Sequence, residues 1–127
     1  MTSGSRILLV DDDPALRMIV SEELAAEGFI VDEAERTDQA IELLSQCQYD
    51  LAVVDLNLSG ESGLDILKHI SQCGGTCKAI TMTGACKRDA VASMEFGAAD
   101  FVSKPFEMDE LIAMIKAVLH QDQVVLS

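Results

Sequence analysis

Acidic side chains close two of the apolar runs in this sequence, and a threonine and a lysine close two others. Asp11 and Asp12 follow the first run, and Asp55 follows the third. Thr83 and Lys104 end the fourth and fifth. Like charges a few ångströms apart repel by about 4 kcal/mol per pair at a surface-like dielectric, so grouped carboxylates need a cation. Mg²⁺ prefers oxygen ligands of this kind, and a carboxylate beside it can accept a phosphoryl group while a lysine balances the charge.

Short β-rich runs alternate with longer stretches of helical apolar spacing, a pattern typical of α/β proteins. Strands are predicted over 7–10, 30–34, 51–54, 79–83 and 101–103. Helices are predicted over 14–27, after Thr37 with Ala40, Ile41 and Leu44 in it, from 64 to the Gly74-Gly75 pair, over 87–96 and over 107–120. This strict alternation predicts a single domain spanning 1–127, with its core over 6–120.

Several residues indicate where individual elements begin and end. Asp13 is a favoured N-cap residue, and Gly28 suits the position after the first helix. Thr37 is predicted to cap the second helix. The Lys104-Pro105 bond is predicted to be cis, because X-Pro bonds lose only about 0.5–1 kcal/mol in that form and the turn must direct the lysine inward.

Five right-handed βα units make a doubly wound parallel sheet with helices on both faces. Ligands of such sheets bind beyond the carboxyl ends of the strands, where the direction of winding reverses. The residues that close the strands are therefore expected to meet in one pocket. That pocket would hold three carboxylates, one hydroxyl and one lysine.

Composition excludes several classes of function. The chain has 127 residues, with 9 Lys and Arg against 22 Asp and Glu, and its net charge is −13. This charge would repel a phosphate backbone, so we expect no nucleic-acid binding by this domain. The longest apolar run, Leu111 to Ile115, is too short to span a membrane, and the amino terminus has no signal-peptide core. We therefore expect a cytoplasmic protein that does not interact with membranes.

The four cysteines could suggest a zinc site. Cys73 and Cys77 are separated by three residues, while Cys47 and Cys86 lie elsewhere in the sequence. No second close pair of Cys or His completes four zinc ligands. The cysteines are therefore expected to be reduced structural thiols.

Four stretches together carry a family resemblance: ILLVDDDP, LAVVDLNLSGESGLDIL, AITMTG and ADFVSKPF. With them the chain resembles the receiver domain of two-component response regulators, from Arg6 to His120. The resemblance implies a five-stranded parallel sheet with strand order 2-1-3-4-5 in chain order. It also implies phosphorylation by a sensor histidine kinase or a histidine phosphotransfer protein, and signalling to an output domain or a downstream protein.

The resemblance also implies a role for each site residue. Asp55 would be the phosphoacceptor, and Asp11 and Asp12 would hold Mg²⁺ with it. The backbone carbonyl of Asn57 would be a further metal ligand. The domain would be no enzyme beyond catalysing its own phosphorylation and dephosphorylation.

Three further residues take roles in the switch that the resemblance implies. Thr83 would hydrogen-bond a phosphoryl oxygen, Lys104 would pair with that group, and Phe101 would swing inward on activation. The face formed by the helix over 87–96, the strand over 101–103 and the helix over 107–120 would change. That face could also support a homodimer.

The loop after Asp55 departs from the family pattern. Ser59 stands where proline is common, and Glu61-Ser62-Gly63 replaces a frequent Met-Asp-Gly. We expect these departures to loosen the loop without touching the chemistry.

Three alternative functions are compatible with parts of this sequence. A degenerate receiver would bind partners without phosphorylation. A flavodoxin-like electron carrier shares the architecture, but its first loop cradles a phosphate that the run Asp11 to Asp13 would repel. An aspartate-nucleophile phosphatase would carry its nucleophile after the first strand, whereas Asp55 follows the third.

Overall fold

A computed structural model describes residues 4–73, 75–84 and 87–121 of the chain. The main sheet contains β1 (Arg6–Val10), β2 (Ile30–Ala34), β3 (Leu51–Asp55), β6 (Lys78–Thr83) and β7 (Asp100–Ser103). A small hairpin contains β4 (Asn57–Leu58) and β5 (Glu61–Ser62). The helices are α1 (Pro14–Ala26), α2 (Thr37–Gln46), α3 (Leu64–Gln72), α4 (Lys87–Glu95) and α5 (Met108–Gln121).

The main sheet has the strand order β2-β1-β3-β6-β7, and every neighbouring pair is parallel. This is the predicted order 2-1-3-4-5, so the doubly wound α/β fold is confirmed. Val10 lies opposite Val54, and Asp55 lies opposite Met82. This register brings the carboxyl ends of β1, β3 and β6 to one edge of the sheet.

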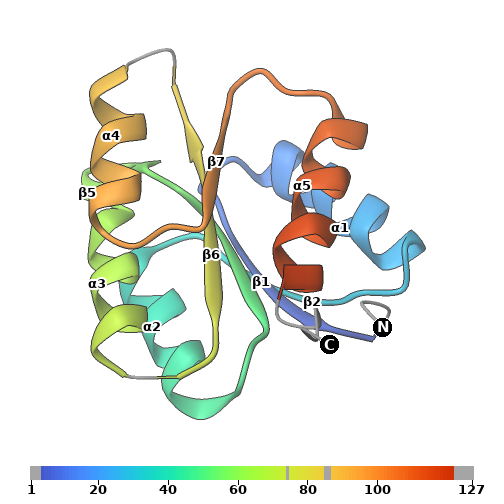
Figure 1. The fold of residues 1–127 in the computed structure, drawn as a ribbon, viewed down its shortest axis with the longest axis horizontal. Coiled ribbons are helices and arrows are strands. Elements are labelled where there is room, and N and C mark those ends of the chain that lie inside the picture. Colours follow the sequence, from blue (N-terminus) through green and yellow to red (C-terminus); the bar gives the residue numbers. More distant parts are fainter. Residues whose placement is uncertain (1–3, 74, 85–86, 122–127) are drawn as a thin grey trace.

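Helices cover both faces of the sheet, with α1 and α5 on one side and α2, α3 and α4 on the other (Figure 1). Alternate residues of β1 point to opposite faces. Ile7 and Leu9 pack in the cluster with Leu24, whereas Leu8 and Val10 pack in a second cluster. All four of these β1 residues are fully buried, which explains the continuous apolar run in the sequence.

The predicted ends of the first helix are confirmed. The Asp13 carboxylate accepts hydrogen bonds from the backbone N–H groups of Ala15, at 3.0 Å, and Leu16, at 3.4 Å. Gly28 follows the helix with a φ of 96°, a conformation that glycine adopts without strain.

The predicted cap of the second helix is wrong. Arg36 is the N-cap residue of α2, and Thr37 is the first residue of the helix. The Thr37 hydroxyl is buried and has no hydrogen-bond partner among the residues that the structure describes. Its backbone N–H instead donates to Glu61 Oε1 at 2.9 Å. A side chain distant in sequence therefore satisfies one of the free N–H groups at the start of α2.

The sequence predicts only a loop where β4 and β5 form a hairpin. Its strands have two residues each, too few to show an alternating pattern. Gly60 forms its turn with a φ of 72°. Gly63 follows the hairpin, where an added Cβ would collide with the backbone oxygen of Asp55. The glycine therefore lets α3 begin directly against the end of β3.

None of the helices in the described ranges is both long and apolar enough to cross a membrane.

Candidate functional site

The three predicted carboxylates come together at the carboxyl end of the sheet. Asp11 and Asp12 follow β1, and Asp55 ends β3, which is the neighbouring strand. One carboxylate oxygen from each residue lies within 4.8 Å of the other two. No other group of three or more His, Cys, Asp or Glu side chains approaches this closely in the part of the chain that the structure describes.

Lys104 reaches into this group from the turn after β7. Its Nζ lies 2.9 Å from Asp11 Oδ2 and 2.8 Å from Asp55 Oδ2. The side chains of Asp11 and Asp55 are 1% and 5% exposed, so both ion pairs are largely withdrawn from water. The Lys104-Pro105 bond is cis, as predicted.

Backbone groups orient the two buried carboxylates. Asp11 Oδ1 accepts a 2.9 Å hydrogen bond from the N–H of Asp13, and Asp55 Oδ1 accepts one of 2.9 Å from the N–H of Asn57. The Arg17 guanidinium donates to the backbone oxygen of Asp11 at 2.7 Å. Each carboxylate therefore has one oxygen held by the backbone and the other by Lys104.

The surroundings shift the pKa values of these groups. Burial raises the pKa of Asp55, although the hydrogen bond from Lys104 acts in the opposite direction. Burial also opposes the charge on Lys104, but the hydrogen bonds to Asp55 and Asp11 outweigh it and raise the pKa of the lysine. Lys104 is therefore favoured in its charged form, and further positive charge would stabilise the ionised form of Asp55.

Asp12 lies closer to solvent and has a different partner. Its Oδ2 accepts hydrogen bonds from the backbone N–H of Ser59, at 2.9 Å, and from the Ser59 hydroxyl. The hydroxyl bond is the main reason that the pKa of Asp12 is lowered. The prediction that Ser59 and Glu61 loosen this loop is wrong, because Ser59 ties it to Asp12 and Glu61 ties it to α2. Sequence reasoning missed both contacts, and no local pattern indicates them.

Thr83 and Phe101 lie on the neighbouring strands β6 and β7, where Thr83 is opposite Ser103 and Phe101 is opposite Thr81. Thr83 is the last residue of β6 and is buried. Its hydroxyl makes two long contacts with β7, at 3.5 Å to the Val102 backbone oxygen and 3.4 Å to Ser103 Oγ. Phe101 is half-buried on β7. The hydroxyl is therefore held only weakly where it lies.

The donor set fits a hard divalent cation. Three ionised carboxylates and one ammonium carry a charge of −3 + 1 = −2. Mg²⁺ binds carboxylate and carbonyl oxygens and keeps several waters, and the half-exposed Asp12 leaves access from solvent. Asn57 follows Asp55 by two residues, so its backbone lies beside the same group.

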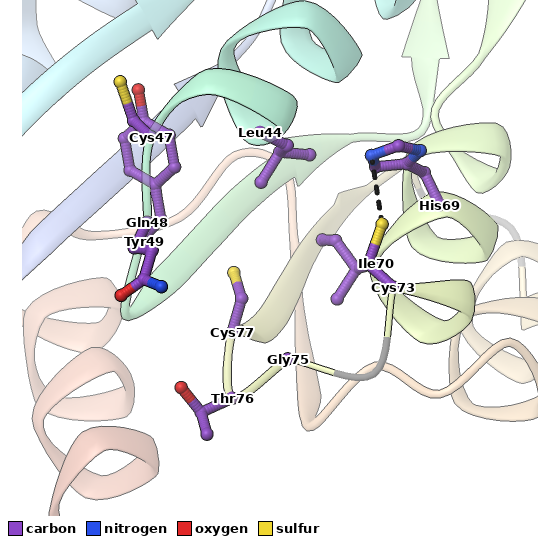
Figure 2. A pocket seen from close by; sticks show the side chains of 10 residues that line it. All are labelled: Leu44, Cys47, Gln48, Tyr49, His69, Ile70, Cys73, Gly75, Thr76 and Cys77. Carbon is purple, nitrogen blue, oxygen red and sulfur yellow. Dashed lines mark hydrogen bonds between the residues drawn. The ribbon is translucent and has the colours of Figure 1, made fainter.

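The three cysteines that the structure describes do not form a comparable site. A hollow of about 380 Å³ lies at the amino ends of β3 and β6 (Figure 2). Leu44, Cys47, Gln48, Tyr49, His69, Ile70, Cys73, Gly75, Thr76 and Cys77 line it. Cys47, Cys73 and Cys77 are free thiols that do not converge as metal ligands among the described residues. Cys86 lies outside those residues.

Comparison with known proteins identifies relatives over nearly the whole chain. A sequence model described as the response regulator receiver domain matches residues 7–116. The two-component response regulator PhoP of Pseudomonas aeruginosa is 33% identical over 91% of this chain and 52% of its own length. The regulatory protein VirG of Agrobacterium tumefaciens is 36% identical over 89% of this chain and 43% of its own length. The chain thus spans about half the length of these relatives.

Solved structures of response regulator proteins are similar to most of this chain. A CheY-like response regulator receiver domain protein from Methanospirillum hungatei superposes with a TM-score of 0.89 at 29% identity, covering 95% of this chain and 98% of that one. The response regulator TrrA from Thermotoga maritima, solved in complex with Mg²⁺ and BeF, gives 0.80 at 34% identity, with 90% and 98% covered.

Proposed function

The chain belongs to the response regulator receiver domain family, and we propose that it acts as a signalling switch in which Asp55 accepts a phosphoryl group. The observation that carries this proposal is the Lys104 ammonium, which lies 2.9 Å from Asp11 and 2.8 Å from Asp55. Buried carboxylates held around a lysine at the end of a doubly wound sheet are arranged to receive a phosphoryl group.

The phosphoryl donor in this proposal is a sensor histidine kinase or a histidine phosphotransfer protein. A carboxylate oxygen of Asp55 attacks the phosphorus of a phosphohistidine, the new O–P bond forms, and the P–N bond breaks. The released imidazole nitrogen takes a proton from solvent. Lys104 faces the reacting carboxylate and balances the negative charge of the phosphoryl oxygens.

The proposed cofactor is Mg²⁺. Asp11, Asp12 and Asp55 would hold it with the backbone carbonyl of Asn57, and it would neutralise charge on the phosphoryl oxygens. The carboxylate trio supports this assignment. TrrA, which is 34% identical, was solved with Mg²⁺ and BeF. The chain acts on no other substrate in this proposal, so its only catalysis is its own phosphorylation and dephosphorylation.

The proposed output lies on the face formed by α4, β7 and α5. Attraction of the Thr83 hydroxyl to the phosphoryl group vacates space beside β7, and the half-buried Phe101 ring moves into it. Burying more of the ring contributes about 1–3 kcal/mol, which shifts a two-state population about ten- to a hundredfold. An output domain, a downstream protein or a second copy then binds the changed face, where Val91 and Met94 are exposed.

Chemical phosphorylation tests the acceptor residue. Incubation with acetyl phosphate and Mg²⁺ should add one phosphoryl group to the intact mass of the wild-type protein. The Asp55→Asn variant should gain none. Asp65→Asn, in the first turn of α3, is the matched control and should be modified like the wild type. Equal modification of Asp55→Asn would refute the assignment, and no modification of any variant would favour a phosphorylation-independent interaction module.

A second experiment tests the switch. Beryllofluoride with Mg²⁺ mimics the phosphoryl group, and backbone amide shifts of residues 90–110 report on the α4–β7–α5 face. Wild-type shifts should extend from the pocket to this face. In Thr83→Ala they should remain near Asp55. Changes confined to the pocket in the wild type, or equally widespread in the variant, would contradict the coupling.

A further inference from the structure

Asp12 is held differently from the other two carboxylates of the site. Asp11 and Asp55 are buried and share the Lys104 ammonium. Asp12 is half-exposed, and two donors from Ser59 meet its Oδ2. The orientation of Asp12 therefore depends on a residue that follows β4, a segment 47 residues away in sequence.

The two bonds leave one oxygen of Asp12 available. A carboxylate oxygen offers two lone pairs, and the N–H and hydroxyl of Ser59 occupy both on Oδ2. Oδ1 is then the oxygen that can face a cation or one of its waters. Mg²⁺ takes one oxygen from each carboxylate in compact octahedral geometry, so an Asp12 held in this way is already suited to it.

Ser59 also joins two segments that carry site residues. It lies in the turn of the β4–β5 hairpin, two residues after Asn57. The buried Leu58 anchors the hairpin in the core, and Glu61 binds the N–H of Thr37 at 2.9 Å. The hairpin is thus attached to α2 on one side and to Asp12 on the other. The backbone at Asn57 keeps its place relative to Asp12 before any cation binds.

We infer that Ser59 is a positioning residue for the cation site, because it fixes Asp12 and the Asn57 backbone in the arrangement that a divalent cation needs. The inference rests on the proposed Mg²⁺ site. Hydrogen-bond partners of metal ligands typically change metal affinity about 10- to 100-fold when removed. Ser59→Ala keeps the backbone donor, so the expected loss is about tenfold, at the low end of that range.

Mg²⁺ titration by isothermal calorimetry tests this role. Ser59→Ala should bind about tenfold more weakly than the wild type, and Ser59→Thr, which keeps a hydroxyl, should restore the affinity. Ser62→Ala is the matched control, because Ser62 lies in the same hairpin and its hydroxyl accepts from the N–H of Leu64, at 3.2 Å, on the side of α3. Its affinity should equal that of the wild type. If Ser59→Ala binds Mg²⁺ as tightly as the wild type, or more tightly, the inference is overturned.

Two further measurements distinguish an error in the role of Ser59 from an error in the proposed cation site. Asp12→Asn should lose most Mg²⁺ affinity, and if it binds like the wild type, or the wild type does not bind, the proposed cation site itself is wrong. Hydrogen exchange at the Ser59 amide needs no variant. Its protection should be kept or increased when Mg²⁺ is added, and loss of protection would mean that the cation displaces Ser59, which also overturns the inference.

Discussion

The two ends of the same sheet carry different kinds of side-chain groups. At the carboxyl end, the Lys104 ammonium lies 2.9 Å from Asp11 Oδ2 and 2.8 Å from Asp55 Oδ2. At the amino end, thiols surround a hollow of about 380 Å³ without converging (Figure 2). Burying unpaired charge is costly, whereas a thiol packs like a small apolar group. Converging charge, and not the size of a hollow, is therefore the reason that the proposed phosphorylation site is assigned to the carboxyl end.

Contacts at the amino end are those of packing. Cys73 Sγ lies 3.4 Å from His69 Nε2, where His69 belongs to the last turn of α3 and Cys73 is the C-cap residue of that helix. Burial raises the pKa of the Cys77 thiol to about 12, so this thiol stays protonated at neutral pH. The nearby Tyr49 hydroxyl donates to Asp32 at 2.7 Å. The same Asp32 carboxylate pairs with Arg6 at 3.3 Å, so its charge is balanced within a partly exposed ion pair.

Removing the Lys104 ammonium at the carboxyl end of the sheet should give the largest effect, which is on the rate of phosphorylation. Lys104→Met removes the cation that faces Asp11 and Asp55, and loss of one such group typically slows a transfer step on the order of 100-fold or more. The rate of phosphorylation by acetyl phosphate, followed by intact mass, measures it. Lys116→Met is the control, because Lys116 pairs with Glu27 on the surface. Equal rates in the two variants would contradict a role for Lys104.

Cation binding should give the next largest effect. Mg²⁺ at about 100 times its dissociation constant should stabilise the fold by about 2.7 kcal/mol if it binds only the folded state. Urea denaturation with and without Mg²⁺ measures this gain. Asp12→Asn should lose most of it, whereas Asp109→Asn, in the first turn of α5, should keep it. A gain that survives in Asp12→Asn would place the cation elsewhere.

Two threonine hydroxyls on β6 allow a structural group to be compared with one proposed to act in the switch. Thr81 donates to the buried Ser93 at 2.8 Å, whereas the contacts of Thr83 are 3.4 Å or longer. Thr81→Val should therefore lower the free energy of unfolding by about 1 kcal/mol, and Thr83→Val by less. Only Thr83→Val should uncouple beryllofluoride binding from the α4–β7–α5 face. Equal destabilisation by both substitutions would mean that the Thr83 hydroxyl is also structural.

The smallest effects are expected at the amino end. At pH 8, iodoacetamide should label the exposed Cys73 well before Cys77, because the thiolate reacts and the raised pKa of Cys77 suppresses it. Peptide mass spectrometry distinguishes the two sites. Cys73→Ser should change the phosphorylation rate by no more than about twofold, as expected for a surface substitution. A larger change would link this hollow to the phosphorylation site.

Features set by long apolar patterns were predictable from the sequence. The alternation of strands and helices determines the sheet, and the sheet brings Asp11, Asp55 and Lys104 to one edge. The cap by Asp13 was predictable because it is local, with its acceptor two residues from its donor. These predictions needed only the period of the pattern and the preferences of single residues.

Contacts between distant short segments were not predictable. The hydroxyl of Ser59 and the carboxylate of Glu61 find their partners in Asp12 and Thr37 only after the hairpin has folded against β1 and α2. Because proline is common at the position of Ser59 in the family pattern, a serine there predicts a looser loop. The structure shows a polar side chain at that position that makes tertiary hydrogen bonds.

Direct location of the phosphoryl group tests the central claim, which is that Asp55 is the acceptor. Borohydride reduces an aspartyl phosphate to homoserine and leaves free carboxylates unchanged, so the modified residue can be read by tandem mass spectrometry. After treatment with acetyl phosphate and Mg²⁺, we expect homoserine at position 55 alone. Homoserine at Asp11 or Asp12, or a stable phosphoryl group on another type of side chain, would contradict the account.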